Sequence, residues 1–147
     1  YTQRTREEMM DCEFLPFLLP TEGSDGIGPH AIMVGHIAAP ALSSEEEPAS
    51  LSYGVVTELL REDLLPEEDV LVITDSLSMG AITKTYTPEE AAVLALQAGC
   101  DLLLMPQGLE AAFEAVWEAV QSGQISEQRL DDSVARILRY KQQYAGL

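Results

Sequence analysis

Three short apolar runs constrain the fold of this chain more than any other feature. None of them alternates polar with apolar residues, and such runs are typical of strands covered on both faces in a parallel sheet. They occupy residues 31–34, 70–73 and 102–105. Because stretches with helical period lie before, between and after them, the sequence predicts an α/β fold of parallel βα units with about three strands.

The first two helical stretches carry signals that set their ends. One covers residues 6–18, and we expect it to end or kink near Leu15, because Pro16 cannot continue the hydrogen-bond ladder of a helix. The other begins at Ser50 or Ser52, since either hydroxyl can accept a hydrogen bond from the free N–H groups of a first helical turn.

Three further helices are predicted in the second half of the chain. The first of them opens with Thr87, Pro88 and Glu90, which form a capping box with proline at the first helical position. The next ends at Gly123, and the last begins near Ser126. We expect the last two helices to bury apolar faces. These faces carry Leu109, Phe113, Val116, Trp117 and Val120 on one helix and Leu130, Val134, Ile137 and Leu138 on the other.

The charge of the chain argues against two classes of partner. Its 147 residues include 8 Lys and Arg against 25 Asp and Glu, which gives a formal net charge of −17. Nucleic acids and anionic lipid surfaces repel such a chain, and no apolar stretch reaches the roughly 18 residues that a membrane helix needs. We therefore expect no nucleic-acid partner and no membrane partner. A hydrophobic content of 46% is enough for one domain with a buried core.

The cysteine pattern indicates a reducing compartment. Cys12 and Cys100 form neither the spacing of a metal site nor a disulfide framework. The histidines and carboxylates also show no metal-ligand spacing, and the start of the chain does not read as a signal peptide. We therefore expect no metal and no cofactor; the location stays open, with a cytoplasmic one favoured.

Polar residues follow the predicted strands, at the edge where parallel α/β proteins place their reactive groups. His36 follows the first run and Asp75 follows the second. A carboxylate held at a strand end can act as a nucleophile, a general base, a metal ligand or a phosphate acceptor. Two structural alternatives stay open: Asp75 caps a short helical turn over residues 77–82, and His36 is a hydrogen-bonded core residue.

Residues 72–82, Val-Ile-Thr-Asp-Ser-Leu-Ser-Met-Gly-Ala-Ile, resemble the nucleophile segment of family 3 glycoside hydrolases, especially of the β-N-acetylglucosaminidase branch. That segment has an apolar run, Ser or Thr, Asp, and then Leu and Met at fixed spacing before Ala or Gly and Ile. The resemblance covers nearly the whole chain, because other blocks are similar to the family in the same order. These blocks are residues 13–17, 32–37, 48–52, 59–61, 90–92, 98–104 and 133–141.

The resemblance implies a fold and a reaction. The fold is a partial (β/α)8 TIM barrel, in which residues 1–147 form a single partial domain from the C-terminal portion of the barrel. The reaction is retaining hydrolysis of terminal β-N-acetylglucosaminides through a covalent glycosyl-enzyme on Asp75. By the same match His36 lines the pocket, Met79 packs beside the sugar, and Ser76 stands where many relatives carry a second Asp. The implied partner is a carbohydrate substrate.

The chain also departs from the family pattern. It lacks the upstream Lys-His-Phe-Pro-Gly-His-Gly block, which in relatives carries sugar-binding groups and leads into the loop with the Asp–His pair of the general acid/base. Because general acid–base catalysis is worth about 10²–10⁴-fold in rate, we expect the isolated chain to be inactive or nearly so. A cut barrel exposes two strand edges and one apolar inner face, so we also expect the chain to self-associate, to repack its sheet or to pair with the missing barrel part.

Three alternatives stay open. The first is a non-catalytic interaction or scaffold module that kept the glycosidase frame and lost its chemistry. The second is an enzyme with the specificity of a β-glucosidase, because family 3 also contains β-glucosidases and β-xylosidases. The third is a receiver-like signalling domain, in which an Asp after an apolar strand accepts phosphate. Such a domain needs an early acidic pair and five strands, and the sequence shows neither.

Overall fold

The computed structural model describes residues 1–22, 29–43, 47–66 and 69–146. Helices surround two short strands, and they include a 3₁₀-helix, η1, and a π-helix, η2. In chain order the elements are α1 (Arg6–Met10), α2 (Leu15–Glu22), β1 (Ala31–Val34), η1 (Ala49–Leu51), η2 (Gly54–Leu64), β2 (Leu71–Thr74), α3 (Gly80–Thr83), α4 (Pro88–Ala98), α5 (Leu109–Gln121) and α6 (Glu127–Tyr144).

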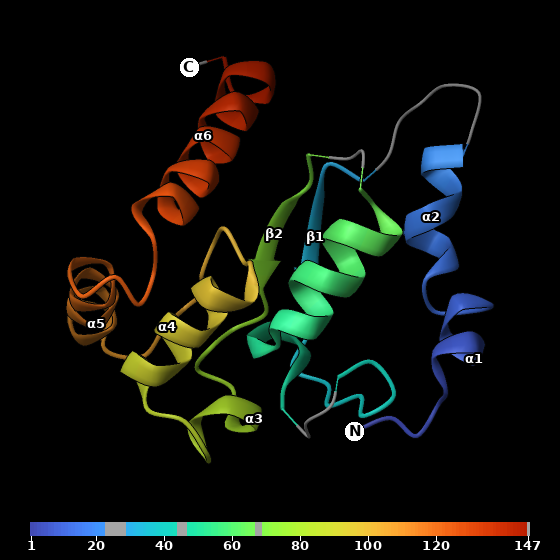
Figure 1. Ribbon diagram of the computed structural model, residues 1–147, viewed down its shortest axis with the longest axis horizontal. Coiled ribbons are helices and arrows are strands. Elements are labelled where there is room, and N and C mark those ends of the chain that lie inside the picture. Colours follow the sequence, from blue (N-terminus) through green and yellow to red (C-terminus); the bar gives the residue numbers. More distant parts are fainter. Residues whose placement is uncertain (23–28, 44–46, 67–68, 147) are drawn as a thin grey trace.

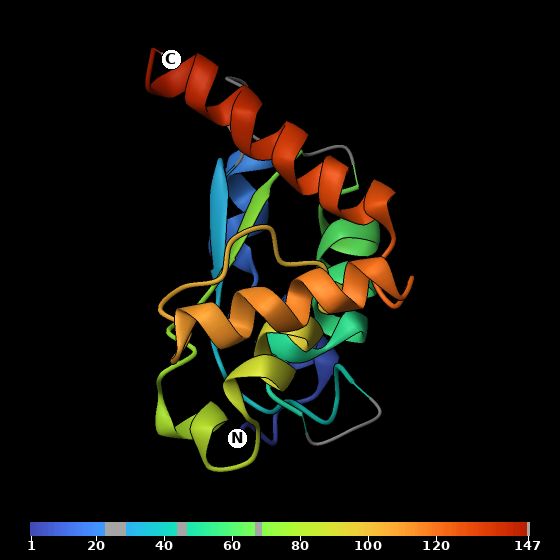
Figure 2. The ribbon, with the colours of Figure 1, turned by 90° about the vertical axis from the view of Figure 1, so that its left-hand side faces the viewer.

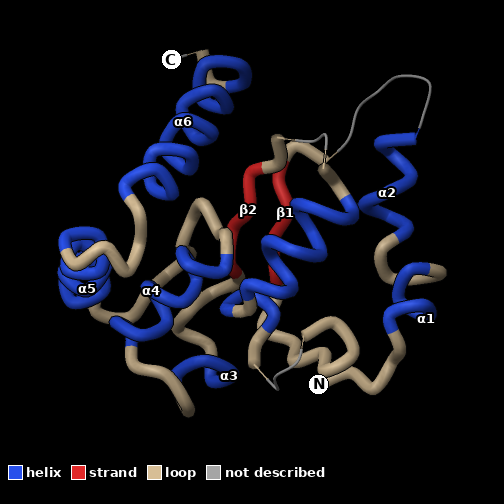
Figure 3. Tube along the Cα trace, in the orientation of Figure 1, coloured by secondary structure: helices blue, strands red, loops and turns tan. Residues whose placement is uncertain are grey.

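The two strands lie side by side at the centre of the molecule (Figure 1, Figure 3). They pair in parallel, from Ala31 opposite Leu71 to Val34 opposite Thr74. The parallel α/β class is therefore confirmed. The first predicted strand is also confirmed, and the second begins one residue later than predicted.

The third predicted strand contributes one parallel bridge, between Leu102 and Ile73. Two residues further on, the N–H of Leu104 donates to the hydroxyl of Thr74 at 3.0 Å instead of to a backbone carbonyl. Met105 then adopts a positive φ of 48°. Because a strand needs an extended backbone, the ladder stops there, and the predicted extent of this strand is wrong.

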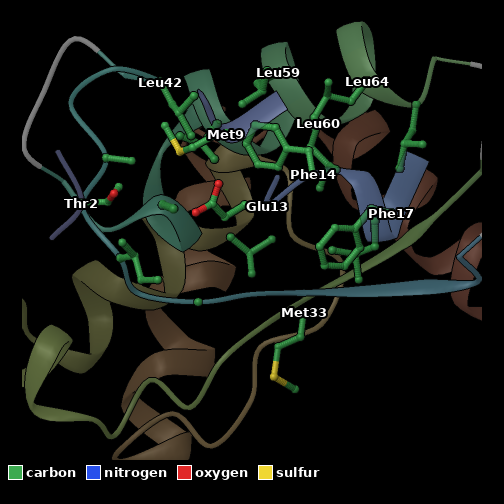
Figure 4. Close-up of a pocket in the computed structure, with 18 of the residues that line it drawn as sticks. Thr2, Met9, Glu13, Phe14, Phe17, Met33, Leu42, Leu59, Leu60 and Leu64 are labelled. Carbon is green, nitrogen blue, oxygen red and sulfur yellow. The ribbon is translucent and has the colours of Figure 1, made fainter. Parts of the chain in front are cut away.

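One face of the sheet is buried and the other is open. Ile32 and Val72 lie in the main core with Val56 of η2 and Cys100. Met33 lies on the other side of β1 from η2 (Figure 4) and is 54% exposed. The expectation that both faces are covered is therefore wrong for this chain, because two strands cannot curl into a barrel that would enclose the inner face.

Two helices replace the single helix predicted over residues 6–18. α1 ends at Met10, and α2 begins at Leu15. Pro16 lies in the first turn of α2, where its missing N–H needs no partner in the helix. The break therefore comes before the proline, and the prediction that the helix ends near Leu15 is wrong.

Ser50 and Ser52 do not cap the helix that follows them. η2 begins at Gly54 without a side-chain cap. Both serines are fully buried; the hydroxyl of Ser52 donates to that of Ser43 at 3.2 Å, and the hydroxyl of Ser50 pairs with His36. The predicted cap is wrong because tertiary contacts take both hydroxyls away from the helix end.

α4 begins and ends at residues with clear local signals. The Thr87 hydroxyl accepts from the N–H of Glu90 at 3.2 Å, and the Glu90 carboxylate accepts from the N–H of Thr87 at 2.8 Å. Pro88 takes the first helical position, so the predicted capping box is confirmed. Gly99 ends the helix with a φ of 119°, and a Cβ there would lie 2.6 Å from the hydroxyl of Thr57. Only glycine fits this helix end.

The apolar face predicted for α5 is mostly exposed. Leu109, Phe113 and Trp117 are 70%, 66% and 59% exposed, whereas Ala112 and Ala119 are buried. The small side chains let α5 approach α4 closely, so the helix turns its alanine side inward and its large residues outward. Figure 2 shows α5 crossing the face of the molecule in front of α4.

α6 docks through a polar face, so its predicted apolar face is also wrong. Ser133 is its buried residue, while Val134 and Leu138 are about half exposed. Ser126 caps the helix as predicted, by accepting from the N–H of Arg129 at 3.1 Å. Within the described ranges, neither α6 nor any other helix combines the length and the apolar character needed to cross a membrane.

A buried carboxylate explains how α6 is attached. The Asp101 side chain is fully buried and accepts hydrogen bonds from two guanidinium groups, at 2.7 Å from Arg61 of η2 and 2.6 Å from Arg136 of α6. It also accepts from the hydroxyl of Ser133 at 2.5 Å and from the N–H of Val72 at 2.9 Å. A buried charge needs such partners, and here they join β2, η2 and α6.

Candidate active site

The ends of β1 and β2 lie at one edge of the sheet. Val34 stands opposite Thr74, and the N–H of Asp75 donates to the carbonyl oxygen of Val34 at 2.9 Å. The next polar residue after β1 is His36. Parallel pairing therefore brings His36 and Asp75, which lie 39 positions apart in the sequence, to the same edge.

The His36 ring is held at both nitrogens. Nδ1 lies 2.7 Å from the hydroxyl of Ser50, and Nε2 lies 2.9 Å from the carbonyl oxygen of Ser76. A carbonyl oxygen only accepts, so Nε2 carries a proton, and in the neutral ring Nδ1 accepts from the Ser50 hydroxyl. The ring thereby links η1 to the turn after β2.

The Asp75 side chain is half-buried beside that turn. Its Oδ1 accepts from the N–H of Ser76 at 2.7 Å. The following helix, α3, begins at Gly80 with Met79 as its N-cap residue and no side-chain cap. The alternative that Asp75 caps a helical turn over residues 77–82 is therefore wrong.

Met79 completes the group of residues at this edge. Its side chain is 45% exposed, and its N–H donates to the carbonyl oxygen of Ser76 at 3.0 Å. Ser76 thus contacts all three predicted site residues: its N–H binds Asp75, and its carbonyl oxygen binds both His36 and Met79. The structure brings together the three residues that the sequence singled out.

An apolar cavity lies next to β1, away from these residues (Figure 4). It has a volume of about 380 Å³ and is enclosed by α1, α2, η2 and β1. Phe14 and Phe17 line it from one side and Leu60 from another, and neither Asp75 nor His36 belongs to its wall. The candidate active site is therefore separate from this cavity.

Neither cysteine is among the residues that the sequence predicted for this site, although the Cys100 thiol donates to the carbonyl oxygen of Ser50 at 3.5 Å. Cys12 is exposed and Cys100 is buried, and both are free thiols. Burial, reinforced by the neighbouring Asp101 carboxylate, raises the pKa of the Cys100 thiol to about 12. Across the described segments, no three His, Cys, Asp or Glu side chains are grouped as metal ligands.

A comparison with protein families matches residues 1–140 to the "Glycosyl hydrolase family 3 N terminal domain". The chain belongs to glycosyl hydrolase family 3. This membership replaces the receiver-like alternative and confirms the resemblance on which the expected fold rests.

The relatives of this family 3 chain carry glycosidase names. It is 34% identical over 121 residues to a "Beta-N-acetylglucosaminidase/beta-glucosidase" of Cellulomonas fimi, covering 78% of the chain and 22% of the relative. It is 28% identical to "Beta-hexosaminidase A" of Pseudoalteromonas piscicida, covering 92% and 25%. A solved family 3 β-N-acetylglucosaminidase from Paenibacillus sp. superposes with a TM-score of 0.86 at 41% identity, covering 97% of the chain and 26% of that structure.

The family 3 chain is thus a partial α/β fragment of a TIM-barrel fold. It spans about a quarter of the length of these relatives. β1, β2 and the bridge at Leu102 are the part of the barrel sheet that the described residues contain.

Sequence reasoning missed two residues that build this site. The sequence predicts Ser50 as a helix cap and Ser76 as a substituted position beside Asp75. The signal for Ser50 is its place in a block that resembles the family. A serine there can bond a residue distant in the sequence instead of capping the next helix. Ser76 acts mainly through its backbone, which its residue type does not reveal.

Proposed function

We propose that this chain carries the nucleophile of a retaining glycoside hydrolase that acts on terminal β-N-acetylglucosaminides, with Asp75 as the attacking carboxylate. One observation carries the proposal: Asp75 follows β2 directly and is bonded through its N–H to the end of β1, in the segment that resembles the family's nucleophile segment. Barrel enzymes place their chemistry at this end of their strands.

The hydrogen bonds of Asp75 fit a nucleophile. The Ser76 N–H donates to Oδ1 at 2.7 Å and fixes the orientation of the carboxylate. Among the described residues no other group donates to this carboxylate, so Oδ2 is left for the sugar. In the proposed step Oδ2 forms a bond to the anomeric carbon while the glycosidic bond breaks and the leaving oxygen takes a proton. Water then hydrolyses the glycosyl-enzyme.

His36 and Met79 are proposed to line the sugar site. Both nitrogens of the His36 ring are engaged, so the ring serves as a fixed wall and not as a proton donor to the leaving group. The Met79 side chain is half exposed, its N–H bonds to the same Ser76 carbonyl oxygen as His36, and it offers an apolar surface to a sugar ring. This arrangement supports the roles that the resemblance implies for both residues.

The proton donor is proposed to lie outside this chain. His36 is held by Ser50 and Ser76, and His30 lies against Tyr140 and Tyr144 at the opposite end of β1. We therefore propose that the isolated chain hydrolyses an ordinary aryl N-acetylglucosaminide at a negligible rate, and that residues 1–147 form a single partial domain from the C-terminal portion of the barrel. Robust turnover by the pure chain would contradict this.

The free edge of β1 supports a proposal about assembly. Among the described residues β1 has one neighbour in the sheet, β2. An unpaired edge favours pairing with the missing barrel part or with another copy of the chain. Gel filtration that shows a monomer at all concentrations, with no change when the missing part is added, would contradict this proposal.

The nucleophile is tested with a substrate that needs no acid catalyst. A dinitrophenyl N-acetylglucosaminide has a leaving group that departs without a proton, so the expected result is a covalent N-acetylhexosaminyl adduct on the peptide that contains Asp75. Asp75→Asn should abolish the adduct, whereas Asp131→Asn, a change of an exposed carboxylate on α6, should retain it. An adduct on another residue, or none at all, would contradict the assignment.

Two observations favour second candidates. The Cellulomonas fimi relative is named for both β-N-acetylglucosaminidase and β-glucosidase, which favours β-glucosidase specificity as one alternative. The hydrogen bond from Ser76 to Asp75 lies within one turn and favours a structural role for the carboxylate, as in a non-catalytic module. β-Glucosidase specificity predicts an adduct with dinitrophenyl glucoside. A non-catalytic module predicts no adduct with either the glucoside or the N-acetylglucosaminide.

A further inference from the structure

α5 presents two neighbouring stripes of exposed side chains. Leu109, Phe113 and Trp117 follow one another at intervals of four residues and form an apolar stripe. Each is followed by an exposed glutamate, so Glu110, Glu114 and Glu118 form an acidic stripe with the same spacing. Residues four apart share a helix face and consecutive residues lie about 100° apart around the axis, so the two stripes run side by side.

Residues of the two stripes line two hollows in the surface. A hollow of about 340 Å³ is lined by Leu109, Glu110, Phe113 and Glu114. A groove of about 630 Å³ runs between α4 and α5, with Val93 and Ala115 in its wall and Glu118 among its carboxylates. Glu110 and Glu114 therefore line one concave surface with apolar side chains, and Glu118 lines another.

The charge of this region selects the partner. α4 and α5 contain no Lys, Arg or His. Of the eight Lys and Arg in the chain, Arg61 and Arg136 are bound to Asp101, and Arg139 is bound to Asp69. A second copy would bring the same carboxylates against this surface and be repelled. A partner with positive charge beside apolar side chains matches both stripes at once.

We propose that the α5 surface binds a basic amphipathic helix of another polypeptide. Its apolar side chains pack against the stripe of Leu109, Phe113 and Trp117, and its Lys or Arg side chains pair with the acidic stripe. Exposed apolar residues concentrated on one surface mark interaction sites, and an amphipathic helix in a groove is a common mode of peptide recognition. This surface is formed by α4 and α5 and does not include the strand-end residues His36, Asp75 and Met79.

The experiment uses Trp117 as the reporter. It is the one tryptophan in the chain, so its emission reports directly on whether the stripe is covered. The probe is a synthetic helical peptide of Leu and Lys with Lys on one face, added to the 147-residue chain. We expect a saturable blue shift of the emission that weakens as salt is added. A peptide of the same composition with a scrambled order should bind at least about tenfold more weakly.

Matched charge variants separate this surface from the net charge of the chain. Glu114→Lys/Glu118→Lys and Glu62→Lys/Asp131→Lys change the net charge equally and replace exposed residues. The α5 pair is expected to weaken binding by about tenfold or more relative to the control pair. Glu114→Gln/Glu118→Gln gives a milder version of the same test, and Phe113→Ser removes apolar contact alone.

Three results would overturn the proposal. One is equal affinity of the two charge variants, which would mean that the peptide responds to net charge. Another is binding without a shift in Trp117 emission, which would place the peptide elsewhere. The last is a blue shift that follows the concentration of the chain itself without peptide, which would make a second copy the occupant.

Discussion

The Nε2 atom of His36 and the carbonyl oxygen of Ser76 lie 2.9 Å apart, and this contact joins the end of β1 to the turn that follows Asp75. Because the hydroxyl of Ser50 holds the other nitrogen of the ring, a fully buried serine on η1 sets the position of the histidine. The geometry of the candidate active site therefore depends on a residue that does not contact Asp75 in any hydrogen bond between described residues.

Ser50→Ala tests this dependence. The change leaves Nδ1 of His36 without its partner, which is expected to destabilise the chain by about 1–3 kcal/mol in urea unfolding. Amide exchange over residues 75–79 should also become faster, because the ring no longer fixes the turn. Ser78→Ala is the control, since it removes the hydroxyl contact with Ser76 and leaves His36 in place. Equal exchange in the two variants would contradict the role of Ser50.

Asp101→Asn is expected to cost far more stability. Asp101 is the fully buried acceptor for Arg61 and Arg136, and its neutralisation leaves Arg61 without a counter-charge, while Arg136 keeps only the half-exposed Asp69. Removing one partner of a buried ion pair costs about 3–5 kcal/mol. Asp69→Asn, at a half-exposed carboxylate that also binds Arg136, should cost about 0–1 kcal/mol. Chemical unfolding of the two variants measures both values, and similar losses would refute the distinction.

Acid is expected to remove the contribution of Asp69. Partial burial raises the pKa of this carboxyl, but hydrogen bonds from Arg136 and Arg139 outweigh burial, and the folded-state pKa lies below the ordinary value of 3.8. The stabilisation is therefore fully present above the unfolded-state pKa and is lost as the pH falls through the folded-state pKa. The stability difference between wild type and Asp69→Asn should be constant from neutral pH to about pH 5 and shrink below about pH 4. A difference that grows in acid would have the wrong sign.

The two cysteines should differ sharply in reactivity. Burial raises the pKa of Cys100 to about 12, and the thiolate is the form that reacts with alkylating reagents. At pH 8 iodoacetamide should modify exposed Cys12 and leave Cys100 intact until the chain unfolds. Mass spectrometry of peptides before and after urea treatment measures this, and rapid labelling of Cys100 in the folded chain would show that its surroundings are open.

Local signals predicted the parts of the fold that local chemistry determines. The capping box of Thr87 and Glu90 is formed within four residues, and β1 was recognised from its apolar run. The strand ends at His36 and Asp75 followed from the parallel sheet. The family could be recognised because ordered blocks extend over nearly the whole chain.

The remaining features depend on contacts that are distant in the sequence. The ladder at Leu102 stops because of the Thr74 hydroxyl and the positive φ of Met105. Neither feature can be detected in the pattern of apolar residues along the sequence. α6 turns its polar side inward because Asp101, 32 positions before Ser133, is buried beneath it. The apolar pattern of that helix could not reveal a buried acceptor elsewhere in the chain.

The attachment of α6 has a thermal consequence. Exposure of apolar surface increases the heat capacity on unfolding, whereas exposure of polar surface lowers it. Since α6 is held by guanidinium, hydroxyl and carboxylate groups, its release adds little to that increment. Cooling weakens contacts between hydrocarbon side chains. The contacts of α6 should therefore persist to lower temperature than those of the apolar core between η2 and the sheet.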